Sequence, residues 1–137
     1  MNIFQPLAVF TKDDNGNYDG YSPNVKGAFS YGKTIAEATA NMKEAIEGVM
    51  ETALEHGYNG VLMDSGYKGE EGEIVIPIPV EKRLCVAASI HLARERTGMN
   101  QEEFARKIGI NRETVCRYER GKRMPSADTF LEILEAV

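Results

Sequence analysis

Two periods of hydrophobic and polar positions follow one another along the first half of this chain. Short stretches rich in β-branched and aromatic residues predict four strands, at residues 3–10, 18–22, 27–31 and 73–80. The Asn-Gly pair that follows the first stretch predicts a hairpin. A proline in the first stretch predicts a strand near a sheet edge, and two prolines in the last exclude a central position for it.

Between the third and fourth stretches the period changes to that of a helix. Thr34 and Glu37 have the spacing of a capping box at its start, and Gly57 ends it. Apolar residues at spacings of three and four form one stripe: Ile35, Ala38, Met42, Ile46, Val49 and Ala53. Residues 58–72 form a glycine-rich acidic loop. The pattern therefore predicts a β-β-β-α-β domain, a small sheet with one face covered by one long helix.

The last 38 residues, 100–137, predict three short helices in succession. Asn100 caps the first, Asn111 caps the second and Ser126 caps the third. Gly109 and Gly121 end the first two. Two helices joined through a Gly-x-Asn turn are typical of a helix-turn-helix, whose second helix enters the major groove of DNA.

The second of these helices carries the side chains that DNA recognition requires. Its first turn holds Arg112, Glu113 and Thr114, and Arg117 lies one turn further along the same face. Arginine can donate two hydrogen bonds to guanine, and glutamate can accept one from cytosine. Hydrophobic residues should face inward instead: Ile108, Ile110, Val115 and Tyr118.

Three cations follow this helix and would position the DNA backbone without reading sequence: Arg120, Lys122 and Arg123. Other interpretations stay open. Arg117 has the spacing to pair with Glu113, the three cations could be merely solvated, and the helix-turn-helix could serve only for dimerisation.

Charge divides the chain in the same place as the hydrophobic pattern. The 137 residues carry a net charge of −5. From residue 81 onward there are eleven basic and nine acidic residues, a net of +2, which leaves five basic and twelve acidic residues, a net of −7, in residues 1–80. We therefore expect two domains, residues 1–80 and 81–137, the first suited to a basic protein and the second to phosphate.

Other chemistry is weakly indicated. Cys85 and Cys116 are too few for a disulfide framework, no signal peptide is apparent, and no apolar run approaches the roughly 18 residues needed to span a bilayer, so a cytoplasmic location is expected. His56 and His91 lack metal-ligand spacing, and we expect neither metal nor cofactor. Aromatic residues of the strands should pack within the sheet: Tyr18, Tyr21, Phe29 and Tyr31.

The first half resembles the N-terminal domain of HicB antitoxins. The resemblance covers roughly residues 5–55 and follows the family's order of an aspartate-rich hairpin, an aromatic strand, a Pro-x-x-x-Gly turn and a Thr-capped helix. The matching residues are Asp13, Asp14, Tyr18, Pro23, Gly27, Gly32, Thr34, Glu37, Ala38, Asn41 and Ala45. Ala28 stands where the family often has cysteine. The resemblance implies a partial RNase H-like sheet without nuclease activity.

The second half, about residues 86–137, resembles the lambda-repressor-like (Xre/Cro) helix-turn-helix, which HicB antitoxins commonly carry. By this resemblance Arg112, Glu113 and Arg117 match base-reading positions, Thr114 a base or phosphate position, and Gln101 a phosphate-binding glutamine. Repressors of this type usually have five helices, whereas this sequence predicts four.

The sequence thus predicts an α+β protein that acts as the antitoxin of a HicAB-type system. The resemblance implies that it neutralises a small RNA-cleaving HicA-like toxin and represses its own operon as a homodimer or higher even oligomer. One alternative is a stand-alone transcriptional regulator whose first domain senses a ligand. Another is a metal-dependent nuclease built on Asp13, Asp14 and Asp19, although aspartate beside Asn-Gly is favoured by the turn itself. We expect no enzyme activity.

Overall fold

The structure is a computed structural model that describes residues 2–136. The chain separates into two compact units. One spans Gln5–Glu81 and contains the sheet, and the other contains residues 82–136 together with residues 2–4. An antiparallel sheet with one helix, followed by four further helices, gives the α+β class that the sequence predicts.

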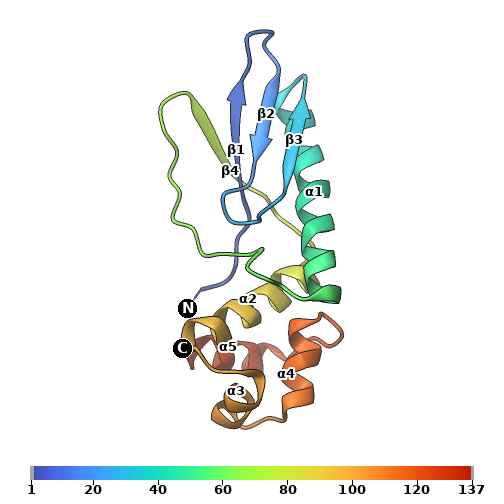
Figure 1. The fold of residues 1–137 in the computed structure, drawn as a ribbon, viewed down its shortest axis with the longest axis vertical. Coiled ribbons are helices and arrows are strands. Elements are labelled where there is room, and N and C mark those ends of the chain that lie inside the picture. The colour runs from blue at the N-terminus through green and yellow to red at the C-terminus, as the bar shows by residue number, and fades with distance from the viewer. Residues whose placement is uncertain (1, 137) are drawn as a thin grey trace. The chain divides into compact units, whose positions relative to one another are not determined.

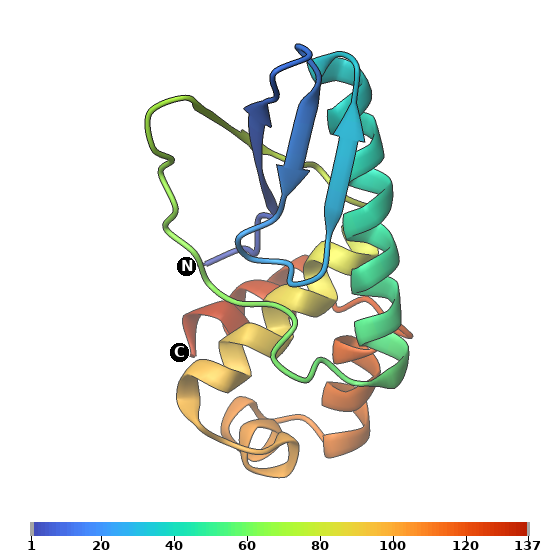
Figure 2. The same ribbon diagram turned by 45° about the horizontal axis from the view of Figure 1, so that its top comes forward.

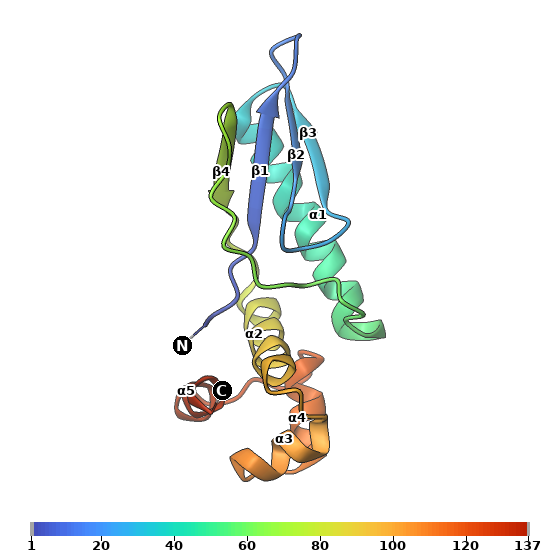
Figure 3. The ribbon, with the colours of Figure 1, turned by 60° about the vertical axis from the view of Figure 1, so that its left-hand side comes forward.

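The sheet unit holds four antiparallel strands in the order β3-β2-β1-β4. Their bounds are β1 Leu7–Lys12, β2 Tyr18–Tyr21, β3 Phe29–Gly32 and β4 Glu73–Pro77. One helix, α1 (Ile35–His56), lies behind the sheet in the view of Figure 3, and Figure 1 shows it running beside β3. The predicted β-β-β-α-β order is therefore confirmed.

The start and the buried stripe of α1 follow from its sequence. The Thr34 hydroxyl accepts a hydrogen bond from the Glu37 backbone N–H at 3.1 Å, which satisfies one of the free donors of the first turn. Ala38, Met42 and Ile46 of the predicted stripe are fully buried. At the other end Gly57 caps the helix with φ 107°, a conformation that other residues rarely adopt.

Glycine lets β3 approach α1 closely. A Cβ added to Gly32 would overlap the backbone of Ala38, which cannot move without shifting the first turn of α1. Beside it, the Ser30 hydroxyl donates a hydrogen bond of 3.0 Å to the Ala38 carbonyl oxygen. The face of the sheet that carries Ser30 is therefore the face that packs against α1.

The place of β1 differs from the prediction. β1 lies between β2 and β4, in the interior of the sheet, rather than near an edge. Pro6 precedes the strand, which begins at Leu7, so the missing N–H of proline removes no hydrogen bond from the ladder. Pro77 ends β4, which is an edge strand as predicted.

The helical unit contains α2 (Lys82–Thr97), α3 (Gln101–Ile108), α4 (Arg112–Glu119) and α5 (Ala127–Glu135), coloured from yellow to red in Figure 2. Its core joins residues of all four helices: Ile90, Phe104, Ala105, Val115, Tyr118 and Ile133. The backbone of Phe4 also belongs to this unit. Its N–H donates to the Ser89 hydroxyl at 2.8 Å, and its carbonyl accepts from the Cys85 thiol at 3.2 Å.

Candidate nucleic-acid interface

Caps fix both ends of α3 and the start of α4. Asn100 and Glu103 form the predicted capping box, with each side chain bonded to the other residue's backbone N–H at 2.8 and 3.1 Å. Gly109 ends α3 in the left-handed conformation, with φ 79°. Two residues later Asn111 caps α4 through a bond of 2.8 Å from the Thr114 N–H. The recognition helix therefore starts at a defined residue and angle.

The end of α4 is equally defined. Gly121 has φ 67°. Its N–H donates to the Tyr118 carbonyl at 3.1 Å, and the Lys122 N–H donates to the Arg117 carbonyl at 2.9 Å. These two bonds form a Schellman motif, in which the left-handed residue turns the chain away from the helix. The predicted backbone-binding cations Arg120, Lys122 and Arg123 are all exposed around this turn.

The two faces of α4 divide as the sequence predicts. Val115 and Tyr118 are buried in the core of the helical unit, and Ile108 and Ile110 pack against it. Arg112, Glu113 and Arg117 are exposed. Arg117 and Glu113 approach to 3.9 Å, with side chains 58% and 77% exposed. An ion pair this open to water contributes at most a few tenths of a kcal/mol, so binding to DNA would easily displace it.

Thr114 is less available than its neighbours. Its hydroxyl donates a hydrogen bond of 2.8 Å to the Asn111 side-chain oxygen, the same atom that caps α4. The hydroxyl must leave this bond before it can donate to a phosphate. We therefore expect Thr114 to contribute less to DNA affinity than Arg112 or Arg117.

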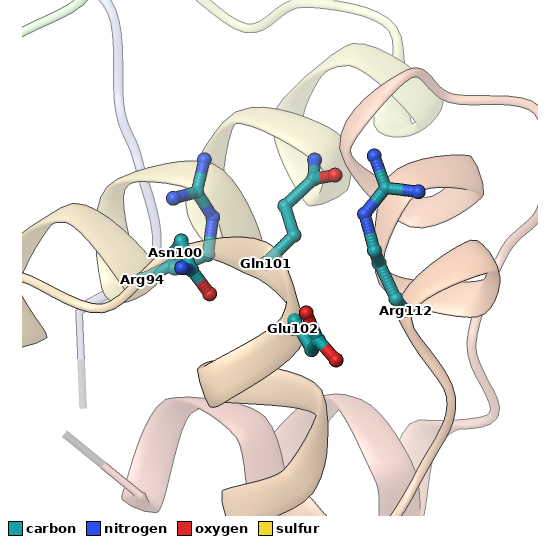
Figure 4. A pocket seen from close by; sticks show the side chains of 5 residues that line it. All are labelled: Arg94, Asn100, Gln101, Glu102 and Arg112. Atoms are coloured by element: carbon teal, nitrogen blue, oxygen red, sulfur yellow. The ribbon is translucent and has the colours of Figure 1, made fainter.

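A shallow hollow lies at the N-terminal ends of α3 and α4. Its volume is about 350 Å³, and it is lined by Arg94, Asn100, Gln101, Glu102 and Arg112. Figure 4 shows the side chains of Arg94, Gln101 and Arg112 extending side by side in the same direction. The free N–H groups at the start of α3 add a positive field. Gln101 and Arg112 thus offer an anion donors of the kind that a DNA phosphate requires. The Arg94 guanidinium, in contrast, already bonds Glu119 and the Met99 carbonyl.

A buried ionic cluster ties the end of α4 to α2. Glu119, which is 2% exposed, accepts two hydrogen bonds from the Arg94 guanidinium, at 2.7 and 3.0 Å. Its carboxylate also lies 2.7 Å from His91 Nδ1, while His91 Nε2 lies 3.1 Å from Glu95. Burial raises the pKa of Glu119, but the bonds with His91 and Arg94 outweigh it and leave that pKa below its ordinary value.

Sequence reasoning did not find this cluster. His91 has no partner at metal-ligand spacing, and it was expected to fill an ordinary surface or core position. Glu119 lies 28 residues from His91 and 25 from Arg94. Only the packing of α2 against α4 brings the three together. The Glu95 partner at i, i+4 was the one signal present in the sequence.

In the sheet unit Asp13 stabilises the hairpin. One oxygen of Asp13 accepts the N–H groups of Asn15 and Asn17, each at 2.9 Å, as expected for aspartate in a turn. Among residues 2–136 no group of three or more His, Cys, Asp or Glu side chains is arranged to hold a metal ion.

The expectation that the strand aromatics pack within the sheet is wrong for three of them. Tyr21, Phe29 and Tyr31 are 38%, 69% and 48% exposed. Their alternation correctly indicates a shared face, but α1 covers the opposite face of the sheet. Tyr18 lies on the α1 side, where Lys12 Nζ sits 5.9 Å from the centre of its ring.

Two family models match the chain, one in each half. The HicB_like antitoxin of bacterial toxin-antitoxin system matches residues 6–65, and the helix-turn-helix family matches residues 90–137. The chain belongs to the HicB-like antitoxin family.

Curated relatives and solved structures of HicB-like proteins match parts of the chain. The UPF0150 protein Ta0767 of Thermoplasma acidophilum is 42% identical over 48 residues, which are 35% of this chain and 70% of that protein. Antitoxin HipB of Escherichia coli O6:H1 is 35% identical over 52 residues, which are 38% of this chain and 55% of that protein.

The crystal structure of the N-terminal domain of antitoxin HicB from Burkholderia pseudomallei matches with 26% identity and a TM-score of 0.44. It covers 57% of this HicB-like chain and 99% of that one. The chain spans about half the length of several of its curated relatives, such as 47% of an HTH-type transcriptional regulator of Archaeoglobus fulgidus. In the described part of the chain, no helix combines the length and apolar character needed to span a membrane.

Proposed function

We propose that this HicB-like protein neutralises a small RNA-cleaving, HicA-like toxin through its sheet unit and represses its own operon through its helix-turn-helix. The observation that carries the proposal is the exposed face of α4. Arg112, Glu113 and Arg117 extend into solvent from a helix whose start, end and buried face are all fixed. Rigid presentation of such side chains is what reading base edges requires.

The arrangement supports a division of labour within the DNA contact. Arg112 and Arg117 can each donate two bonds to guanine, and Glu113 can accept from cytosine. Gln101 and the hollow beside it would hold a phosphate at the start of α3. Arg120, Lys122 and Arg123 would hold the backbone beyond the end of α4. Operator DNA would place this activity in the cytoplasm.

Repression by this kind of motif also implies a second copy. Helix-turn-helix repressors bind two half-sites about 34–36 Å apart, one helical turn of DNA, or a multiple of that distance. One recognition helix reads only one half-site. We therefore propose a homodimer or a higher even oligomer as the DNA-binding form.

The sheet unit supports the toxin part of the proposal through its charge and its family. Residues 1–80 carry twelve acidic and five basic residues, which would repel RNA and attract a basic protein. The proposal includes no catalytic step. Two curated relatives are named as antitoxin HipB and one as an HTH-type transcriptional regulator, and Asp13 is occupied in the turn of the hairpin.

Replacing Arg117 with alanine tests the DNA contact. We expect Arg117→Ala to weaken binding of the full chain to the DNA upstream of its gene by about 1–3 kcal/mol, because one bidentate base contact is lost. Fluorescence anisotropy at several salt concentrations measures this affinity. Binding of the toxin, the small protein encoded beside the gene, should stay unchanged.

Arg106→Ala is the matched control. Arg106 is 76% exposed on α3 and pairs only weakly with Glu102, at 3.8 Å. The Arg106→Ala substitution removes the same charge from the same unit at a position outside the predicted contact. Its effect on DNA affinity should therefore be small. Equal losses in the two variants would mean that binding follows net charge alone. Loss of toxin binding in Arg117→Ala would contradict the division between the units.

A further inference from the structure

The outer face of the sheet, opposite α1, carries exposed aromatic side chains. Tyr21 and Phe29 stand directly opposite each other on β2 and β3, as do Asp19 and Tyr31. Paired residues of antiparallel strands point to the same face, so all four share one surface. We call Tyr21, Phe29, Tyr31 and Asp19 the aromatic patch. Phe29, at 69% exposure, has the most exposed large hydrophobic side chain among residues 2–136.

Part of this face is covered by the chain itself. Val9 lies in the same row as Tyr21 and Phe29 but is only 1% exposed. The glycine-rich loop reaches this part of the sheet, where a Cβ on Gly69 would meet the Val75 side chain at 2.8 Å. In the same loop the Tyr67 hydroxyl donates to the Glu73 carboxylate of β4. The loop therefore covers part of the β1–β4 half of the outer face and reaches Tyr21 of β2, while Phe29 and Tyr31 of β3 stay exposed.

Carboxylates border the exposed aromatic side chains. The second oxygen of Asp13 accepts a bond of 3.4 Å from the Tyr31 hydroxyl, and Asp19 is exposed between the aromatics. Asp13 cannot turn away easily, because its first oxygen accepts two backbone N–H groups of the hairpin. The patch thus combines apolar area with negative charge held in place.

We propose that the aromatic patch is the docking surface for the basic toxin, an assignment that rests on the function proposed above. Aromatic side chains at the centre of an interface contribute most of its binding energy, and carboxylates at its border select a basic partner. A nucleic acid would be repelled by the same carboxylates. A second copy of this chain docked through the same patch would bring the carboxylates of both copies into one contact, where like charges repel.

The other acidic surface of the sheet unit fits a partner less well. α1 exposes Glu37, Glu44 and Glu55. None of the large hydrophobic side chains that are exposed in residues 2–136 lies on α1. Charge alone steers a partner but gives little affinity, because exposed ion pairs are worth little. The aromatic patch offers both negative charge and exposed apolar area.

Calorimetry with the purified protein encoded beside the gene tests the assignment, using the full-length chain. We expect Phe29→Ala and Tyr31→Ala each to weaken binding by roughly 30-fold or more, as for residues at an interface centre. Ile74→Ala is the matched control, since Ile74 is also an exposed hydrophobic residue of the sheet, 42% exposed, outside the patch. It should bind within about threefold of wild type.

Two variants that each remove one negative charge distinguish docking at the aromatic patch from docking at α1. Asp19→Asn should lower the association rate and flatten its dependence on salt, whereas Glu44→Gln, on α1, should change both less. Unchanged melting temperatures would show that the variants fold, which the exposure of Phe29 and Tyr31 predicts.

Each outcome bears on a different part of the proposal. If wild type binds and the patch variants bind equally well, the patch is not the docking surface, although the proposed function stands. If wild type fails to bind and neutralise that protein, the proposed function fails and the assignment with it. A change of oligomeric state in Phe29→Ala, measured by ultracentrifugation, or patch-dependent binding of RNA would also overturn the assignment.

Discussion

At the scale of single residues, Glu119 anchors the C-terminal end of α4 to α2. It is the last residue of α4, it is almost fully buried, and it receives Arg94 and His91 from α2. A buried carboxylate that loses its partners is strongly destabilising, so these contacts must stay intact for α4 to keep its place. The side chains that we propose to read DNA are therefore held in position by a buried cluster at the other end of α4.

Glu119→Gln should destabilise the helical unit by about 1–3 kcal/mol at pH 7, because hydrogen bonds to a charged group are lost in a buried site. Amide hydrogen exchange of peptides from α4 in the full chain measures this effect. Glu113→Gln, on the exposed face of the same helix, is the matched control and should change exchange little.

The effect of Glu119 should depend on pH in one direction. Its folded pKa lies below its ordinary value of 4.5, so the stabilisation is complete above that pH and is lost as the pH falls through the lowered folded pKa. The difference between wild type and Glu119→Gln should narrow over this range below pH 4.5. A difference that widened on acidification would contradict the assigned role.

At the scale of elements, the sequence predicted what local chemistry decides. The caps Thr34, Asn100, Asn111 and Ser126 each begin a helix at the expected residue. The inward faces of α1 and α4 also follow from their spacing of apolar residues. The DNA-binding residues come from this local pattern and from resemblance, and their roles stay predictions.

Long-range arrangement could not be predicted in the same way. Tyr21, Phe29 and Tyr31 share a face because of the pairing of β2 with β3, and nothing in the sequence indicated which face α1 would cover. Pro6 was read as an edge signal, because its position just before the strand depends on where the ladder begins. The His91–Glu119 contact joins residues 28 apart, a distance at which sequence spacing carries no information.

Gly32→Ala should destabilise the sheet unit more than an ordinary glycine-to-alanine change. The added Cβ meets backbone of α1, so β3 and α1 must separate. Overpacking of this kind typically costs about 1–3 kcal/mol. Thermal unfolding followed by circular dichroism measures the loss. Gly48→Ala, in α1, is the control: a Cβ there meets nothing within 4 Å and should stabilise the helix slightly.

At the scale of the whole molecule, the two units differ in charge, and the partners that we propose for them differ in the same way. The residues of the helical unit add cations at the end of α4, while the sheet unit carries the excess of carboxylates. Each unit would repel the other's partner. On this proposal one chain binds a basic protein through its sheet unit and DNA through its helical unit.

Residues 2–4 make the helical unit depend on both ends of the chain. Ser89→Ala should destabilise this unit by about 1–3 kcal/mol, because the Phe4 N–H loses its buried acceptor. Thr52→Ala is the matched control. Its hydroxyl bonds to the carbonyl four residues earlier, as that of Ser89 does, but is exposed, so its loss should matter little. Hydrogen exchange of α2 peptides measures the difference, and exchange should be faster in Ser89→Ala than in Thr52→Ala.

The same contact has a consequence for synthesis of the chain. Phe4 leaves the ribosome well before its hydrogen-bond partner Ser89, which follows 85 residues later. All the strands and α1 precede Ser89, so the sheet can assemble while the partner of Phe4 is still untranslated. A fragment that begins at residue 82 would lack Phe4 and its hydrogen bond to Ser89. Adding a short peptide that contains Phe4 should restore the stability that this fragment loses.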